Sequence, residues 1–408
     1  MSFARLKEIV NIIEFKEIID FLLFPIILII SLLAKPFIRR AWLIEENPDE
    51  ACDNGYVFFK YLCEIKKSKR INSKKCIENK NNINSLEDVD IFYVINKKSK
   101  DYEKVKVIGK VINHGSLKHW IYYLNAEKII VTQKYANPSK ALFYLLHKYK
   151  IIKNDRIFLQ HGVIKDDCKA FYYKETNFNI FICGAKREYE YVKEKYGYPE
   201  NNVCYTGLAR FDDLELEENT NNKLILIAPT WRKWIKSQND FKIFMENYYS
   251  ILENAELQTA LLENNIKIQL VLHKNFSKFK IEKQLIGRNI RINHNKDVDI
   301  QELLNKVELL ITDYSSIFMD VAYRKRPIIY YQFDNEEFRK LHLPEGYFKY
   351  KKDGFGDVIS SEKDVIQKIK KYINNNFKIE KEYEDKMDNF FERKDKNNCQ
   401  RILEEIIE

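Results

Sequence analysis

Short apolar runs alternate between strand-like and helical character along most of the chain. The strand-like runs are rich in Val, Ile, Tyr and Phe, whereas the helical ones have apolar residues at helical spacing. Alternation of this kind predicts an α/β fold in which a parallel sheet carries helices on both faces. The runs that take part lie at 91–96, 105–111, 119–126, 128–133, 141–150, 156–160, 179–185, 202–207, 224–230, 266–273, 289–293, 309–312 and 327–332.

An acidic, Asn-rich stretch at 212–223 divides this pattern into two halves. The second half restarts the alternation and contains a long helical pattern near 241–264. Two such halves joined by a linker predict two Rossmann-like domains with a cleft between them. We therefore divide the chain into a membrane-anchoring segment (1–45), an N-terminal domain (46–215), a C-terminal domain (216–375) and a helical C-terminal segment (376–408).

The segment 21–34, FLLFPIILIISLLA, is strongly apolar and is followed by Lys35, Arg39, Arg40 and Trp42. Its uncharged run is shorter than the ~20 residues that span a bilayer, and Pro25 interrupts it. Acidic residues precede the run and no small-residue cleavage site follows, which disfavours a signal peptide. The pattern favours a helix lying in the membrane surface, with a buried core helix and a spanning helix as the alternatives.

Composition narrows the function only slightly. A hydrophobic content of 45% allows large cores, and seven scattered cysteines without a C-x-x-C pair indicate neither a disulfide framework nor a zinc site. A reduced, cytoplasmic compartment fits best. The net charge of +9 suits anionic lipid, a phosphorylated substrate or nucleic acid, but no nucleic-acid-binding signature is present.

The segment 309–327, LLITDYSSIFMDVAYRKRP, predicts a buried strand, a tight turn and a helix over about 315–326. Such a turn presents free backbone N–H groups, and the hydroxyls of Ser315 and Ser316 lie beside them. This arrangement predicts an anion site. The alternative is that Asp313, Ser315 and Ser316 only cap the helix.

Five short motifs share one position, because each follows directly on a predicted strand. Loops at the carboxyl ends of parallel strands converge on the ligand in open α/β sheets. Two imidazoles, two guanidiniums and a backbone anion site describe a pocket for a polyanion, most simply a diphosphate. The motifs contain no carboxylate cluster or histidine pair that would hold a metal. The residues collected in this way are His161, Arg210, Arg232, His273, Lys274, Ser315 and Ser316.

Several of these residues have a second, purely structural interpretation. His161 is placed where a general base would sit, but it and His273 could instead be hydrogen-bonded turn histidines. Trp231 is interpreted as packing rather than as a platform for a base. Asp320 either accepts hydrogen bonds from a sugar or polyol hydroxyl or pairs with Arg324 at i, i+4.

In order and spacing, these motifs resemble the CDP-glycerol glycerophosphotransferase family, the primases and polymerases of wall teichoic acid and related capsules. The resemblance covers about residues 45–375, including DNGYVFFKYL and NHGSLKHWIYYLNAEKIIVTQ upstream. Two segments depart from the family pattern: LQHGVIKDD replaces Trp-His-Gly-Thr-Pro and LHKN replaces His-Pro. The matching residues are His161-Gly162, Thr206-Gly207, Arg210-Phe211-Asp212, Ala228-Pro229-Thr230, Arg232, His273, Ile311 to Ser316, Asp320, Pro327, Tyr331 and Asp334.

The resemblance implies a GT-B-type fold whose C-terminal domain binds CDP-glycerol or another CDP-alditol. It also implies an N-terminal domain that binds a lipid-linked saccharide or polymer, and peripheral association with the cytoplasmic face of the bacterial membrane. Transfer of the alditol phosphate would release CMP. No cofactor, metal or nucleic acid is expected, and the rival hypotheses are a nucleotide-sugar glycosyltransferase and a non-catalytic scaffold.

Each expected site residue has a role in this hypothesis. His161 is the candidate base, and Arg232 and His273 stabilise the charge that develops at the phosphates. The remaining expected substrate-binding residues are Gly162, Arg210, Thr230, Lys274, Asp313, Ser315, Ser316 and Asp320.

Overall fold

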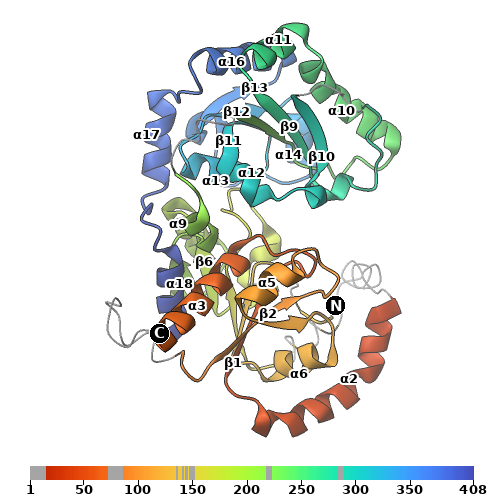
Figure 1. The fold of residues 1–408 in the computed structure, drawn as a ribbon, viewed down its shortest axis with the longest axis vertical. Coiled ribbons are helices and arrows are strands. Elements are labelled where there is room, and N and C mark those ends of the chain that lie inside the picture. Colours follow the sequence, from red (N-terminus) through yellow and green to blue (C-terminus); the bar gives the residue numbers. More distant parts are fainter. Residues whose placement is uncertain are drawn as a thin grey trace.

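The computed structural model describes residues 15–71, 86–134, 137–139, 142, 146, 152–216, 223–283 and 289–408. These form two lobes, each built on an entirely parallel sheet (Figure 1). The two parallel α/β sheets expected from the alternating pattern are thereby confirmed.

The N-terminal lobe contains a seven-stranded sheet in the order β3-β2-β1-β4-β5-β6-β7. Helices α6 and α9 cover one face of this sheet, and α3 packs against the other. Its strands are β1 (Ala41–Glu45), β2 (Asp90–Ile95), β3 (Lys110–Asn113), β4 (Lys128–Val131), β5 (Asp155–Phe158), β6 (Ile180–Cys183) and β7 (Val203–Tyr205); its helices are α3 (Asn54–Ile71), α5 (Tyr102–Ile108), α6 (Leu117–Asn125), α8 (Tyr173–Thr176) and α9 (Lys186–Lys195).

The C-terminal lobe contains a six-stranded sheet in the order β10-β9-β8-β11-β12-β13. Its strands are β8 (Leu224–Ala228), β9 (Lys267–Leu272), β10 (Ile290–His294), β11 (Val307–Thr312), β12 (Ile328–Tyr331) and β13 (Gly356–Ile359); its helices are α10 (Gln238–Leu252), α11 (Ala255–Glu263), α12 (Ile300–Lys306), α13 (Phe318–Tyr323), α14 (Asn335–Leu341), α15 (Tyr350–Asp353) and α16 (Glu362–Asn374).

Strand order reverses between β1 and β4 in one sheet and between β8 and β11 in the other. These are the switch points at which open α/β sheets bind ligands, beyond the carboxyl ends of the strands. The loops that follow β5 in the N-terminal lobe, and β8 and β11 in the C-terminal lobe, carry most of the expected site residues.

Helix α2 (Phe15–Ala34) lies along the outside of the N-terminal lobe beside α6 (Figure 1). A single stripe contacts the lobe: the ring of Phe24 lies 5.8 Å from that of Trp120, and Ile27 is buried. The Nδ2 of Asn125 donates to the Oγ of Ser31 at 2.6 Å. The helix is long and apolar enough to cross a membrane, but only 17% of its most apolar window is buried. The core-helix alternative is therefore wrong, and the helix continues through Pro25.

The exposed side of α2 is almost wholly apolar, and the large side chains on it face solvent. These residues are Ile18, Ile19, Phe21, Leu22, Leu23, Ile26, Ile29, Leu32 and Leu33.

The end of the chain connects the two lobes. Helix α17 (Lys381–Phe390) packs against the C-terminal lobe, and α18 (Asn398–Ile407) returns to the N-terminal lobe beside α3 (Figure 1). There Asp212 accepts hydrogen bonds from the backbone N–H groups of Asn398 (3.1 Å) and Cys399 (2.8 Å). The two lobes also share apolar packing, since the rings of Phe211 and Tyr323 stack with centroids 4.2 Å apart.

Three local expectations differ from the structure. Trp42 was expected in the anchoring segment but lies in β1, at the centre of the sheet, where it is buried. The long helix near 241–264 is two helices, because Asn254 caps a new one by accepting the N–H of Leu257. The helix expected over 315–326 covers only Phe318–Tyr323, and the preceding residues form a turn.

Candidate active site between the lobes

His161 lies in a turn that directly follows β5. Gln160 has a φ of +63° and Gly162 a φ of +156°, so the backbone on both sides of the histidine is in a region that most residues avoid. Buried Glu188 holds the turn in place, since its Oε1 accepts hydrogen bonds from Gln160 Nε2 (3.0 Å) and Ile164 N (2.5 Å). A strained and firmly held turn places the imidazole on the carboxyl edge of the sheet.

The imidazole of His161 has the tautomer that a general base requires. Its Nδ1 lies 3.3 Å from the carbonyl oxygen of Thr132, so Nδ1 carries the proton and Nε2 keeps its lone pair. The surrounding protein atoms lower the pKa of His161, although part of the side chain reaches solvent. Asp53 acts to raise this pKa, whereas Arg210 and Lys274 lower it further. The ring is therefore neutral near pH 7.

The turn after β11 in the C-terminal lobe meets the His161 turn. A Cβ atom placed on Gly162 would lie 3.0 Å from the Oγ of Ser316 and 3.4 Å from Nη2 of Arg210. Ser315 and Ser316 are both half-buried. No side chain caps the short helix α13, whose N-cap is Ile317, so Ser315 and Ser316 are not helix caps. Asp313 accepts the backbone N–H of Tyr314 in its own turn, at 2.5 Å.

A buried ion bridge joins the same two turns. Arg210 donates through Nε and Nη2 to the two carboxylate oxygens of Asp320, at 2.6 and 2.8 Å. Its Nη1 donates to Asp53 (2.6 Å) and to the carbonyl oxygen of His161 (2.7 Å). Burial alone would lower the pKa of Arg210, but the two carboxylates hold it above its ordinary value. Asp320 therefore pairs with Arg210 and not with Arg324, so the expected i, i+4 pair is wrong.

Arg324 has a different set of partners. It donates to the backbone carbonyls of Leu304 (2.6 Å), Asn305 (3.0 Å) and Val307 (3.0 Å).

Arg232, expected to contact the phosphates, is buried and fully engaged. It pairs with Asp313 at 2.9 Å and with Asp334 at 2.6 Å, and it donates to the carbonyl of Thr230 at 2.6 Å. Asp313, also buried, accepts the N–H of Thr230 at 2.9 Å. Both residues thus hold the loops after β8 and β11 together, and the charge of Arg232 is met by carboxylates of the protein itself. The Oγ1 of Thr230 is buried without a hydrogen-bond partner in the described part of the chain.

His273 and Lys274 follow β9 at the same edge of the sheet. The Nδ1 of His273 accepts the N–H of Asn275 at 3.2 Å, which leaves Nε2–H as a donor. Burial and the charge of Lys274 lower the pKa of His273 to about 4. The ring is therefore neutral near pH 7 and presents a hydrogen-bond donor, not a positive charge. Trp231 packs against His273, with ring centroids 6.2 Å apart, as its packing interpretation predicts.

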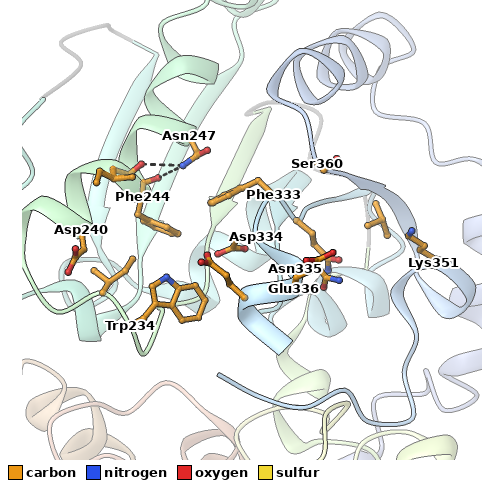
Figure 2. A pocket seen from close by; sticks show the side chains of 15 residues that line it. Trp234, Asp240, Phe244, Asn247, Phe333, Asp334, Asn335, Glu336, Lys351 and Ser360 are labelled. Atoms are coloured by element: carbon orange, nitrogen blue, oxygen red, sulfur yellow. Dashed lines mark hydrogen bonds between the residues drawn. The ribbon is translucent and has the colours of Figure 1, made fainter. Parts of the chain in front are cut away.

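A pocket of about 820 Å³ lies beside these loops, between α10 and the carboxyl ends of β12 and β13 (Figure 2). Aromatic side chains and carboxylates line it, among them Trp234, Phe333 and Glu336. Asp334 connects this acidic pocket to the serine turn, since the hydroxyl of Tyr314 lies 3.3 Å from its Oδ1.

Two functional residues escaped the sequence reasoning. Asp53 and Asn54 were interpreted only as the beginning of a helix, in the segment DNGYVFFKYL. In the structure Asn54 donates to the carbonyl of Gln160 (2.8 Å) and accepts the N–H of Arg210 (3.0 Å). The only available signal was that this segment matches the family pattern, which assigns no role to individual residues.

Fold and site together define a two-lobed α/β protein whose loops gather a neutral histidine, a serine turn and cations at one edge. The family model described as CDP-Glycerol:Poly(glycerophosphate) glycerophosphotransferase matches residues 61–408. The chain belongs to this family.

Two curated relatives and one solved structure illustrate the similarity. The chain is 31% identical to the minor teichoic acid biosynthesis protein GgaB of Bacillus subtilis (strain 168), over 91% of this chain and 40% of GgaB. It is 24% identical to the teichoic acid poly(glycerol phosphate) polymerase of Bacillus spizizenii, over 78% of this chain and 84% of the relative. The chain thus spans less than half the length of GgaB.

Among solved structures, the wall teichoic acid polymerase TagF in a variant soaked with CDPG superposes with a TM-score of 0.61. The sequence identity is 16%, and the match covers 90% of this chain and 88% of that one. At this identity the likeness establishes a shared fold.

Proposed function

We propose that this protein transfers glycerol phosphate, or a related alditol phosphate, from a CDP-alditol to a hydroxyl of a lipid-linked acceptor in teichoic acid synthesis. The observation that carries the proposal is the meeting of two turns across the lobes: Gly162, next to the neutral His161, touches the serine turn at Ser316. Family membership and the CDPG-soaked TagF structure support the choice of donor.

In the proposed reaction the acceptor oxygen attacks the β-phosphorus of the CDP-alditol. A new P–O bond forms, the bond from this phosphorus to the bridging oxygen breaks, and CMP leaves with that electron pair. Nε2 of His161 takes the proton from the attacking hydroxyl. The hydroxyls and amides of Ser315 and Ser316, Nε2–H of His273 and Lys274 stabilise the phosphate charge.

The acidic pocket is the proposed site of the nucleoside part of the donor. Its aromatic side chains offer surfaces for a base, and its carboxylates and amides offer acceptors for ribose hydroxyls and an exocyclic amine. The two lobes would then form the cleft in which donor and acceptor meet.

We also propose that α2 lies in the plane of the membrane on its cytoplasmic face. The helix is fixed to α6 along one stripe, so its apolar outer side can enter the lipid while the lobe stays in water. A helix held in this way along its length would bring the acceptor domain to the surface that carries a lipid-linked substrate.

A CMP-release assay with CDP-glycerol, CDP-ribitol and a short lipid-linked acceptor tests the proposal, with product length measured by mass spectrometry. We expect CMP release with at least one CDP-alditol and a loss of ~10²–10⁴ in kcat for His161→Ala. Turnover of UDP-sugars instead would indicate a glycosyltransferase. Absence of CMP release with every CDP-alditol would indicate a non-catalytic protein.

A further inference from the structure

A second, smaller cavity lies in the C-terminal lobe, between the segment that precedes α10 and the segment that follows β9. Its volume is about 250 Å³, and Lys233, Lys236 and Lys278 surround it together with Asn275. Phe276 and Phe279 are among its apolar lining residues. We call this cavity the lysine pocket.

The charge of the lysine pocket is not compensated by acidic neighbours. None of its lining residues carries a carboxylate, in contrast to the acidic pocket of the same lobe. Lys236 and Lys278 are exposed, and across the described ranges neither makes an ion pair. Asp240, four residues beyond Lys236, accepts the backbone N–H groups of Lys236 (3.1 Å) and Ser237 (2.9 Å) at the start of α10, and among the described residues it forms no ion pair with the side chain of Lys236 or Lys278. The fourth cation, Arg232, is already neutralised by Asp313 and Asp334.

The position of the lysine pocket connects it to the proposed chemistry. Trp231 lines the pocket and packs against His273, so the pocket adjoins the donor-phosphate side of the site. In Figure 1, α10 lies in the upper lobe and α2 at the lower end of the other lobe, so an acceptor held at the membrane beside α2 would reach the lysine pocket only with an extended chain.

We propose that the lysine pocket binds a phosphodiester of the acceptor chain, one or more units behind the hydroxyl that reacts. This inference rests on the proposed function and adds to it an acceptor that already carries alditol phosphate. A phosphodiester has one negative charge, which the lysine ammonium groups meet, and hydroxyl-bearing alditol units on both sides, to which the exposed side chain of Asn275 can hydrogen-bond. The pocket thereby favours extension of an existing chain over addition of a first unit.

The test compares acceptors that carry zero, one, two or four glycerol phosphate units, with CDP-glycerol as donor. For the wild-type protein we expect KM for the acceptor to fall as phosphodiesters are added. In the double variant Lys236→Glu/Lys278→Glu this dependence should disappear, with a rise of roughly 10-fold or more in KM for the longest acceptor. KM for CDP-glycerol and kcat on the phosphate-free acceptor should stay within ~2-fold of wild type.

A matched control keeps the change in charge but moves it away from the pocket. Lys267→Glu/Lys378→Glu replaces two exposed lysines, one at the amino end of β9 and one after α16, and should keep the dependence on acceptor length. If both double variants lose the dependence equally, net charge explains it and the proposal fails. It also fails if the pocket variant raises KM for CDP-glycerol, which would assign the pocket to the donor.

Two further measurements distinguish acceptor binding in the lysine pocket from catalysis itself and from binding of lipid headgroups. Fluorescence anisotropy with a labelled tetra(glycerol phosphate) measures binding without turnover. Loss of binding in the pocket variant would support the proposal even if no CMP were released, whereas unchanged binding would overturn it even in an active enzyme. Weaker binding to anionic vesicles, with the acceptor dependence intact, would assign the pocket to lipid headgroups and reject the acceptor assignment.

Discussion

Replacement of Asp320 by asparagine removes one charge from the buried bridge that joins the two lobes. The carboxylate is inaccessible to solvent and accepts two hydrogen bonds from Arg210. Leaving one partner of a buried pair uncompensated costs about 3–5 kcal/mol. Since Asp53 still contacts Arg210 at 2.6 Å, we expect the lower end, ~3 kcal/mol. For lobes of this size that corresponds to a Tm lower by roughly 6–12 °C.

The effect on catalysis should exceed what this loss of stability explains. Arg210 also holds the carbonyl of His161, so a shifted guanidinium moves the candidate base relative to the serine turn. A displacement of about 1 Å can cost ~10² in rate. We therefore expect kcat in the CMP-release assay to fall ~10²-fold at a temperature at which Asp320→Asn is fully folded.

Asp212→Asn provides the matched control. Asp212 lies in the same short helical turn as Arg210, and it receives hydrogen bonds from α18 without touching the serine turn. This variant should lower Tm but keep kcat within ~3-fold of wild type. The double variant Arg210→Met/Asp320→Leu should regain stability without regaining activity, because apolar pairs can replace buried ion pairs. Wild-type kcat in folded Asp320→Asn would refute the positioning role.

Three further predictions concern the base, the turn and the anchor. Because the pKa of His161 is lowered, the imidazole stays unprotonated at pH values below the ordinary histidine pKa of 6.5. The acid limb of the kcat/KM profile should therefore lie below pH 6.5. Because Asp53 raises this pKa, Asp53→Asn should move that limb to still lower pH, and a move to higher pH would contradict the electrostatics. Gly162→Ala should lower kcat by ~10² or more because its methyl group would press on the serine turn, whereas Gly197→Ala, at a φ of +72° with open space around it, should lower only Tm. Leu22→Asp on the exposed side of α2 should weaken co-sedimentation with anionic vesicles about 10-fold or more without changing Tm, and unchanged sedimentation would count against an in-plane anchor.

Local sequence patterns predicted the sheets well because buried parallel strands are continuous apolar runs. These patterns gave wrong predictions where the same residues are compatible with a membrane interface and with a buried strand, or with one helix and with two. Trp42, preceded by Arg39 and Arg40, has the composition of a membrane interface, yet it belongs to a strand whose partners lie about 50 and 85 residues further along the chain. The apolar pattern over 241–264 predicts one helix, since an asparagine by itself does not end a helical pattern. In the structure the side chain of Asn254 caps a second helix, and the segment divides there.

The sequence predicts which loops lie at strand ends, but it does not show which of their cations are paired inside the protein. Strand ends identify the loops that converge, and these loops contain every expected residue except Asp320, which lies in α13. Whether a cation faces the ligand depends on carboxylates far away in sequence: Asp320 lies 110 residues from Arg210, and Asp334 lies 102 residues from Arg232. Arg210 and Arg232 are therefore neutralised inside the protein, whereas Lys274 remains exposed at the edge.

The segment just after His161, where the chain departs from the family pattern, is bound to the C-terminal lobe. In the segment VIKDD, Lys165 and Asp166 are buried and form an ion pair. Asp166 also accepts a hydrogen bond from Arg339 of the C-terminal lobe at 2.7 Å. Burial alone would raise the pKa of Asp166, but Lys165 and Arg339 hold it below its ordinary value. This carboxylate is thus ionised and bound across the lobes.

The His161 turn therefore lies between two charged contacts that cross from lobe to lobe. Arg210 and Asp320 form one of them, and Asp166 and Arg339 form the other. Gly346 of the C-terminal lobe also packs directly on the backbone of Lys165 and Asp166, where a Cβ atom would collide with it. The Thr-Pro of the family pattern corresponds in position to Val163 and Ile164, so Lys165 and Asp166 follow directly on the two residues that differ. The contacts of Asp166 and the close packing of Gly346 fix how the lobes meet beside the candidate base.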